Sequence, residues 1–212
     1  MPQLKIFPFN PLQVNAYLIY EPHGAGILID PSCADQAEFD ELKAFIDSNH
    51  IRLDYQLNTH GHFDHVFGVR WVRDAFHPKY LIHKGDDQFI RMAGTQARSF
   101  GFDYSGEVPQ PDAELIDNQV ITAGDISLRV IHVPGHSQAC VAFYEAVTGW
   151  LFSGDTLFAG GIGRTDLPGG STKQILRSIR ERLLVLPDET MVFPGHGPSS
   201  TIKKERLTNP YL

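Results

Sequence analysis

Apolar and polar positions along the first thirty residues follow the pattern of short strands. The stretches are bounded by the turn signals Asn10-Pro11 and His23-Gly24. The predicted strands are Leu4 to Phe9, Val14 to Tyr20 and Gly26 to Ile29. The chain therefore opens with a β-meander.

Helical spacing follows this meander. Ala37 to Asn49 is predicted as a helix, with Asp35 as its N-cap and with Phe39, Leu42, Phe45 and Ile46 on one face. Tyr55 to Asn58 is predicted as a strand that ends directly on a run rich in histidine. A second helix is predicted over Val66 to Phe76 and a strand over Tyr80 to His83.

The second half of the chain shows a similar pattern of strands and helices. It predicts strands at Ile126 to Val133, Cys140 to Glu145, Trp150 to Ser153 and Thr190 to Phe193, and a helix at Ile175 to Leu186. Strand runs mixed with a few helices indicate helices layered over two stacked sheets. A length of 212 residues suits one domain with a substantial core, so residues 1–212 are predicted to form a single α/β domain.

Residues 93 to 113 are the least regular part of the sequence. They are rich in Gly, Ser, Asp and Pro, with the aromatic residues Phe100, Phe102 and Tyr104 among them. An irregular stretch of this length in a compact domain is either an active-site lid or a mobile surface segment.

Composition excludes several classes of protein. The formal charge of -7, from 18 Lys and Arg against 25 Asp and Glu, argues against a nucleic-acid partner. No apolar stretch is long enough to span a membrane, and the N-terminus lacks an export signal, so we expect a cytoplasmic protein. Cys33 and Cys140 are too few for a disulfide framework and are predicted to be small core residues.

The histidine-rich run Thr59-His60-Gly61-His62-Phe63-Asp64-His65 predicts a metal site. His60 and His62 are two residues apart and therefore point to one side of an extended stretch, whereas Asp64 and His65 follow where the chain turns into a helix. One short segment can thus serve two adjacent metals. Imidazole and carboxylate suit zinc, and also iron or manganese.

Three later residues extend this pattern. His136, Asp155 and His196 each stand just beyond a predicted strand, where loops converge over a rigid scaffold. Each alone would be an ordinary turn residue. Their recurrence after the histidine-rich run favours a shared metal centre.

The motifs as a set resemble the metallo-β-lactamase superfamily over essentially the whole chain. They are Thr-His-Gly-His-Phe-Asp-His at 59–65, Pro-Gly-His at 134–136, Ser-Gly-Asp-Thr at 153–156 and Pro-Gly-His-Gly at 194–197. The resemblance implies a four-layered αββα sandwich. It also implies a dinuclear centre, in which His60, His62 and His136 bind one metal, Asp64, His65 and His196 bind the other, and Asp155 bridges both.

Within this superfamily the chain resembles a short glyoxalase II, or hydroxyacylglutathione hydrolase. The similarity rests on Asp155-Thr156-Leu157-Phe158 and on the ending Glu205-Arg206-Leu207-Thr208-Asn209-Pro210. It implies that two zinc ions about 3.5 to 4 Å apart share a hydroxide that attacks a thioester such as S-lactoylglutathione. Asp64 is expected either to orient that hydroxide and carry its proton or to act only as a ligand.

The turn Gly161-Ile162-Gly163-Arg164-Thr165-Asp166 allows a second interpretation of the substrate. It resembles the persulfide dioxygenase branch, which uses a single iron and is the alternative function. Arg164 and Asp166 are expected to clamp a substrate carboxylate or to pair with each other. Full-length glyoxalase II proteins continue into a helical domain that holds glutathione, whereas this chain stops at Leu212.

Other branches of the superfamily fit less well. The commonest secreted β-lactamases carry Cys where Asp155 stands, flavodiiron proteins carry a flavin domain, and nucleases of this fold have a larger chain with a basic surface. Thioester hydrolysis by a zinc enzyme therefore remains the first expectation.

Overall fold

The computed structural model describes residues 1–104 and 107–212. The chain divides into two compact units. Unit 1 comprises Met1–Glu114 and Thr122–Ile126, and unit 2 comprises Leu115–Ile121 and Ser127–Leu212. Each unit has its own buried core, and the single domain expected from the chain length stays a prediction.

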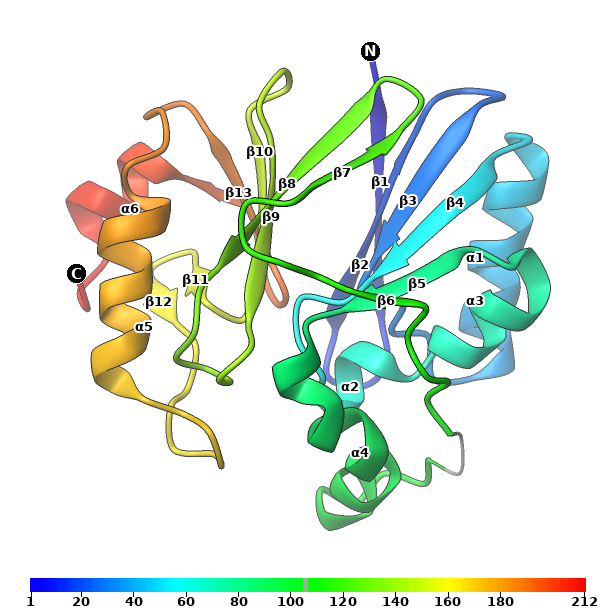
Figure 1. Cartoon of the computed structure of the whole chain (residues 1–212), viewed down its shortest axis with the longest axis horizontal. Helices are drawn as coiled ribbons and strands as arrows, with labels where there is room; N and C mark the ends of the chain where they lie inside the picture. Colours follow the sequence, from blue (N-terminus) through cyan, green and yellow to red (C-terminus); the bar gives the residue numbers. More distant parts are fainter. Residues whose placement is uncertain (105–106) are drawn as a thin grey trace. The chain divides into compact units, whose positions relative to one another are not determined.

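Unit 1 is built on a six-stranded sheet whose spatial order equals the chain order (Figure 1). Its strands are β1 (Gln3–Phe9), β2 (Val14–Tyr20), β3 (Ala25–Ile29), β4 (Arg52–Leu57), β5 (Lys79–Ile82) and β6 (Ala113–Glu114). The predicted opening meander is confirmed, because β1, β2 and β3 pair antiparallel. From β3 to β6 the pairing is parallel, so the carboxyl ends of these strands lie at the same edge.

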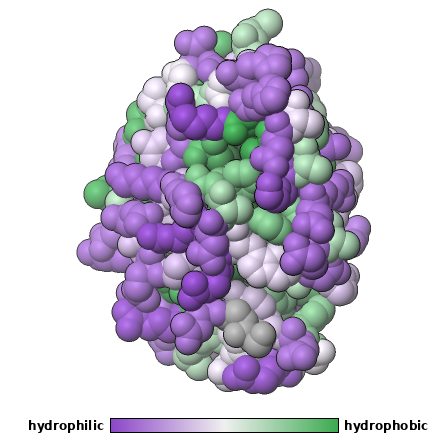
Figure 2. Space-filling model, turned by 90° about the vertical axis from the view of Figure 1, so that its right-hand side faces the viewer, coloured by the Kyte–Doolittle hydropathy of each residue, from purple (hydrophilic) through white to green (hydrophobic). Residues whose placement is uncertain are grey.

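Helices α1 (Gln36–Ser48) and α3 (Val69–Phe76) cover one side of this sheet (Figure 1). Asp35 caps α1 as predicted, because its side chain accepts the N–H of Glu38. Leu42 and Ile46 of α1 pack in one core cluster with strand residues such as Leu28. The surface of the molecule on the side of α1 and α3 is mainly hydrophilic, with a smaller hydrophobic area (Figure 2).

The helix predicted over Val66 to Phe76 is interrupted, which corrects that prediction. It is divided into α2 (Phe63–Val66) and α3, with Phe67 and Gly68 between them. The N–H of Gly68 donates to the carbonyl of Pro31 at 2.8 Å. A Cβ at this position would lie 2.3 Å from the Cys33 Sγ, so close packing against the segment after β3 sets the break.

The irregular segment predicted from residue 93 begins later than expected. A short 3-10 turn (Lys84–Asp86) leads into helix α4 (Asp87–Ser99), so the prediction is wrong for residues 93–99. Ile90, Ala93 and Ala97 give α4 a buried face, and this packing outweighs the low helix propensity of Gly94. The lid stays a prediction, and Ser105 and Gly106 within it lie outside the described residues.

The second sheet has the order β14-β13-β10-β9-β8-β7. Its strands are β7 (Val120–Ala123), β8 (Ile126–His132), β9 (Val141–Glu145), β10 (Trp150–Gly154), β13 (Met191–Pro194) and β14 (Ser200–Thr201). The four strands predicted for this half are confirmed to within one or two residues. The sequence pattern does not predict β7 and β14, because they are only four and two residues long.

Helices α5 (Thr172–Ser178) and α6 (Ile202–Thr208) and the hairpin β11 (Leu157–Phe158) to β12 (Gly161–Ile162) complete unit 2. The helix predicted over Ile175 to Leu186 instead begins at Thr172, where Ser171 caps it, and continues as a π-helical turn (Ile179–Leu183). Ile175, Ile179 and Leu183 are buried in the core of this unit. Their burial explains the apolar pattern that suggested a longer helix.

Two smaller expectations concern the cysteines and the membrane. Cys33 and Cys140 are both buried thiols, as predicted. Within the described residues, none of the helices has the length and apolarity needed to cross a bilayer.

Candidate metal centre

Four of the expected ligands lie at the carboxyl edge of the sheet in unit 1. β4 ends at Leu57, and the histidine-rich run follows at once. His60 and His62 precede α2, while Asp64 and His65 lie on its first turn. The ring centroids of His60 and His65 are 4.1 Å apart and those of His60 and His62 are 4.7 Å apart. The run therefore brings its imidazoles together, as the spacing predicts.

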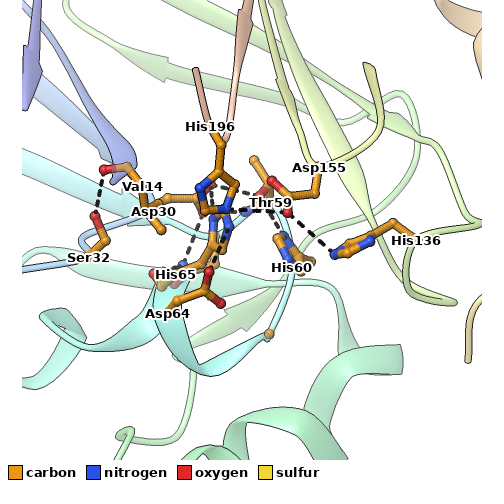
Figure 3. A network of polar contacts seen from close by, with 12 residues as sticks. Val14, Asp30, Ser32, Thr59, His60, Asp64, His65, His136, Asp155 and His196 are labelled. Carbon is orange, nitrogen blue, oxygen red and sulfur yellow. Dashed lines mark hydrogen bonds and ion pairs between the residues drawn. The ribbon is translucent and has the colours of Figure 1, made fainter. Parts of the chain in front are cut away.

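Asp30 anchors this run from the neighbouring strand. It follows β3 directly, and because β3 and β4 are parallel it lies beside Asn58 and Thr59. Its carboxylate is 1% exposed and accepts four hydrogen bonds. The donors are the Thr59 N–H (2.8 Å), the Thr59 hydroxyl (2.7 Å), the Asn58 amide (3.1 Å) and His65 Nδ1 (3.0 Å) (Figure 3).

These bonds determine which nitrogen of two histidines carries the proton. A carboxylate only accepts, so His65 Nδ1 is the protonated nitrogen. The Thr59 hydroxyl gives its one proton to Asp30, so it accepts from His60 Nδ1 at 3.0 Å. Both rings thus keep the lone pair on Nε2, the form in which imidazole binds a metal.

Gly61 allows α4 to approach the run closely. Its N–H donates to the Asp86 carboxylate at 2.8 Å, and a Cβ at this position would lie 3.1 Å from Asp86 and from the Phe89 Cβ. Phe89 also packs edge-on against the His62 ring, with centroids 5.0 Å apart. A residue with a side chain at position 61 would push α4 away from the histidines.

The other three expected ligands lie at one edge of the sheet in unit 2. β10 and β13 are parallel neighbours, so Asp155 and His196 follow their carboxyl ends side by side. The Asp155 carboxylate lies between two imidazoles, with Oδ2 3.6 Å from His136 Nε2 and 3.5 Å from His196 Nε2 (Figure 3). This position of Asp155 within unit 2 is compatible with the bridging role expected for it.

The tautomer of His136 is also set by the fold. Its Nδ1 lies 2.8 Å from the backbone carbonyl oxygen of Arg164, which only accepts, so Nδ1 carries the proton. Nε2 keeps its lone pair and points towards Asp155. His136 is 3% exposed, so this orientation is held away from water.

The donor set fits divalent metal ions. Residues that could hold a metal ion are His60, His62, Asp64 and His65 in unit 1, and His136, Asp155 and His196 in unit 2. Three of these histidines are anchored through Nδ1, by a threonine hydroxyl, a carboxylate and a backbone carbonyl. Such outer partners are typical of histidines that bind metals through Nε2.

Arg164 and Asp166, expected as substrate contacts or as a mutual pair, bind each other. Arg164 Nε and one terminal nitrogen donate to the two carboxylate oxygens of Asp166 at 2.8 and 2.7 Å. The hydrogen bonds from Arg164 hold the pKa of the Asp166 carboxyl at about 2, below its usual value. Both side chains are more than half exposed, so the pair contributes little to stability.

Asp30 and the Arg164 carbonyl were missed at the sequence level. Asp30 had a signal, because it directly follows an apolar strand, as Asp155 does. Backbone carbonyls carry no side-chain signal. The partnership of Arg164 with His136 spans 28 residues and is visible only in the structure.

Comparison with known proteins gives a consistent picture. The family model of the metallo-beta-lactamase superfamily matches residues 9–196. A Haemophilus influenzae protein described as hydroxyacylglutathione hydrolase GloC is 33% identical, over 99% of this chain and 97% of its own.

Two crystal structures also match nearly the whole chain. BLEG-1, a B3 metallo-beta-lactamase, is 33% identical with a TM-score of 0.90 and 99% coverage of both chains. TTHA1623 in a di-iron-bound form is 38% identical with a TM-score of 0.87, over 98% of this chain and 100% of its own. The metallo-β-lactamase fold predicted from the sequence is thereby confirmed.

Proposed function

Because the chain belongs to the metallo-β-lactamase superfamily, we propose that seven of its side chains would together hold one dinuclear metal centre. In this assignment His60, His62 and His136 bind one ion, Asp64, His65 and His196 bind the second, and Asp155 contacts both. The anchored tautomers of His60, His65 and His136 support it. The di-iron form of TTHA1623, which resembles this chain over its whole length, supports two ions rather than one.

The reaction that this centre supports best is hydrolysis of a thioester derived from glutathione, such as S-lactoylglutathione. The chain is a metallo-hydrolase by family, with a small molecule as substrate. The observation that supports a thioester as the substrate is the match to the GloC hydrolase over 99% of the chain. Two buried thiols suit a reducing compartment, so we place the reaction in the cytoplasm.

The side chains of the site have defined parts in this reaction. Metal ions held by these residues would lower the pKa of a bound water and would polarise the thioester carbonyl as Lewis acids. Asp64, on the first turn of α2 with a side chain only 12% exposed, orients the attacking water and takes its proton. The leaving thiol has an ordinary pKa near 8.5, so its departure as thiolate needs no strong acid.

Burial of the histidines keeps their orientation constant during the reaction. His60 and His65 are fully buried, and each is tied through Nδ1 to the group formed by Asp30 and Thr59. Neither ring can rotate or exchange tautomer without breaking these bonds. The site is thus organised before substrate arrives, which is the condition for electrostatic catalysis.

Zinc is the proposed metal, and iron defines the second candidate function. Imidazole and carboxylate donors accept both ions. The Gly-x-Gly-Arg-Thr-Asp run at 161–166, which resembles the persulfide dioxygenase branch, favours a persulfide dioxygenase as that alternative. Metal analysis separates the two, since two zinc ions per chain are expected for the hydrolase and one iron for the dioxygenase.

Turnover assays complete the test. The metal-loaded protein is incubated with S-lactoylglutathione while loss of the thioester is recorded, and separately with glutathione persulfide while oxygen consumption is recorded. Thioester loss without oxygen uptake is expected. A fully loaded protein that leaves S-lactoylglutathione intact would exclude the glyoxalase assignment, and oxygen uptake would establish the alternative.

A further inference from the structure

The segment Gly163–Asp166 connects β12 to the loop before α5 and carries the Gly-Arg-Thr-Asp sequence. Its side chains have no established role in the site. Its backbone, however, contacts two of the expected metal ligands within unit 2.

Gly163 is packed against both of these ligands. A Cβ built on Gly163 would lie 1.8 Å from the backbone oxygen of Asp155 and 3.3 Å from the Cβ of His136. A distance of 1.8 Å is far below van der Waals contact, so any side chain here displaces the turn or Asp155. Glycine is required at position 163 by close approach of the backbone to the ligands.

The next residue holds His136 through its backbone. The carbonyl oxygen of Arg164 accepts the Nδ1 proton of His136 at 2.8 Å. The guanidinium of Arg164 is meanwhile occupied by Asp166, and Thr165 Oγ1 lies 2.7 Å from Thr172 Oγ1 at the start of α5. These contacts maintain the turn that presents the carbonyl.

A buried clamp from α6 holds the hairpin that leads into this turn. Glu205 is fully buried, and its carboxylate accepts the N–H of Gly160 and the side-chain amide of Asn209, both at 2.8 Å. The same Asn209 amide donates to the carbonyl of Gly161 at 3.0 Å. Ser200 donates to the other oxygen of Glu205. Glu205 and Asn209 thus fix the hairpin at Gly160 and Gly161, three and two residues before Gly163.

We propose that Gly163–Asp166 is a positioning turn for His136 and Asp155, and that Glu205 and Asn209 are positioning residues that hold it in place. The backbone of the turn acts on the ligands, whereas the Arg164 side chain only closes the turn. The inference rests on the proposed metal centre for its consequence, which is slower loss of metal. Its geometric part, the anchoring of His136, stands independently.

The test compares Gly163→Ala with Gly161→Ala, a matched control in the same hairpin. A Cβ on Gly161 meets only Phe158, at 3.7 Å, which is ordinary contact. The His136 Nδ1 proton is followed by NMR with and without zinc, and zinc release to a chromogenic chelator is timed. We expect Gly161→Ala to retain the protected proton and the wild-type rate. Gly163→Ala should lose the proton signal and release zinc on the order of tenfold faster or more.

A second pair of variants tests the contacts made by Glu205 and Asn209. It keeps the inference testable if Gly163→Ala does not fold. Asn209→Ala removes the bond to the Gly161 carbonyl, while Leu207→Ala alters an exposed side chain of the same helix. Only Asn209→Ala should weaken the His136 proton signal, which is recorded well below the melting temperature of each variant so that a general loss of stability does not account for it. Wild-type proton signals and zinc release in both Gly163→Ala and Asn209→Ala would overturn the inference. A wild-type protein that binds no zinc or iron would instead overturn the metal centre, since the His136 signal is read without metal.

Discussion

Replacement of Asp30 by Asn tests the reasoning about the buried anchor of the histidine-rich run. The backbone at this position has φ of 50°, a conformation that Asn adopts as readily as Asp, so the change is confined to the side chain. The amide oxygen can keep the bonds from the Thr59 N–H and the Asn58 amide. Its NH₂ group then faces the Thr59 hydroxyl and His65 Nδ1, which both donate in the wild-type protein.

The expected loss of stability follows from the number of hydrogen bonds that the substitution removes. Two hydrogen bonds to a charged acceptor are lost, each worth about 1.5–3 kcal/mol, so the free energy of unfolding should fall by about 3–6 kcal/mol. His65 can regain a bond only by accepting at Nδ1, which moves its proton to Nε2 and blocks that nitrogen. Metal affinity should therefore fall about 10- to 100-fold.

Urea unfolding followed by circular dichroism measures the first effect, and zinc content after dialysis against a weak chelator measures the second. Asp47→Asn is the control, because Asp47 makes an exposed ion pair with Lys43 and should change stability by less than about 1 kcal/mol. Full zinc content and an unfolding free energy within about 0.5 kcal/mol of wild type in Asp30→Asn would refute the anchoring role.

Three further predictions address other parts of the site and core. Asp155→Ala should abolish thioester hydrolysis and lower the metal content measured by mass spectrometry, and an unchanged variant would refute the bridging assignment. The Asp166 carboxyl, whose pKa is lowered to about 2 by Arg164, should keep the ion pair above its ordinary pKa of 3.8 and lose it only as the pH falls through 2. Carbon-13 NMR should show this midpoint return towards 3.8 in Arg164→Ala, and no return would refute the cause. Burial raises the pKa of the Cys33 thiol to about 12, and Cys140 is also buried, so neither should react with Ellman's reagent at pH 8 until the protein is unfolded. Fast reaction of the native protein would contradict this.

The local pattern of the sequence was sufficient to predict most strands. Strands such as β2 and β10 contain apolar runs, and His60, Asp155 and His196 stand shortly after the ends of β4, β10 and β13. Helix ends were less accurate. The break at Gly68 and the π-helical turn after α5 depend on contacts with residues distant in the chain, which periodicity does not encode.

The sequence by itself determined the family to which the chain belongs and the residue types of the proposed metal centre, because metal ligation demands particular side chains at particular spacings. Only the tertiary structure decided how those side chains are held. Asp30 reaches His65 because two parallel strands end side by side, and the Arg164 carbonyl reaches His136 because Gly163 lets the backbone come close. These partners are a common carboxylate and a backbone group, which become specific only once folding places them at hydrogen-bonding distance.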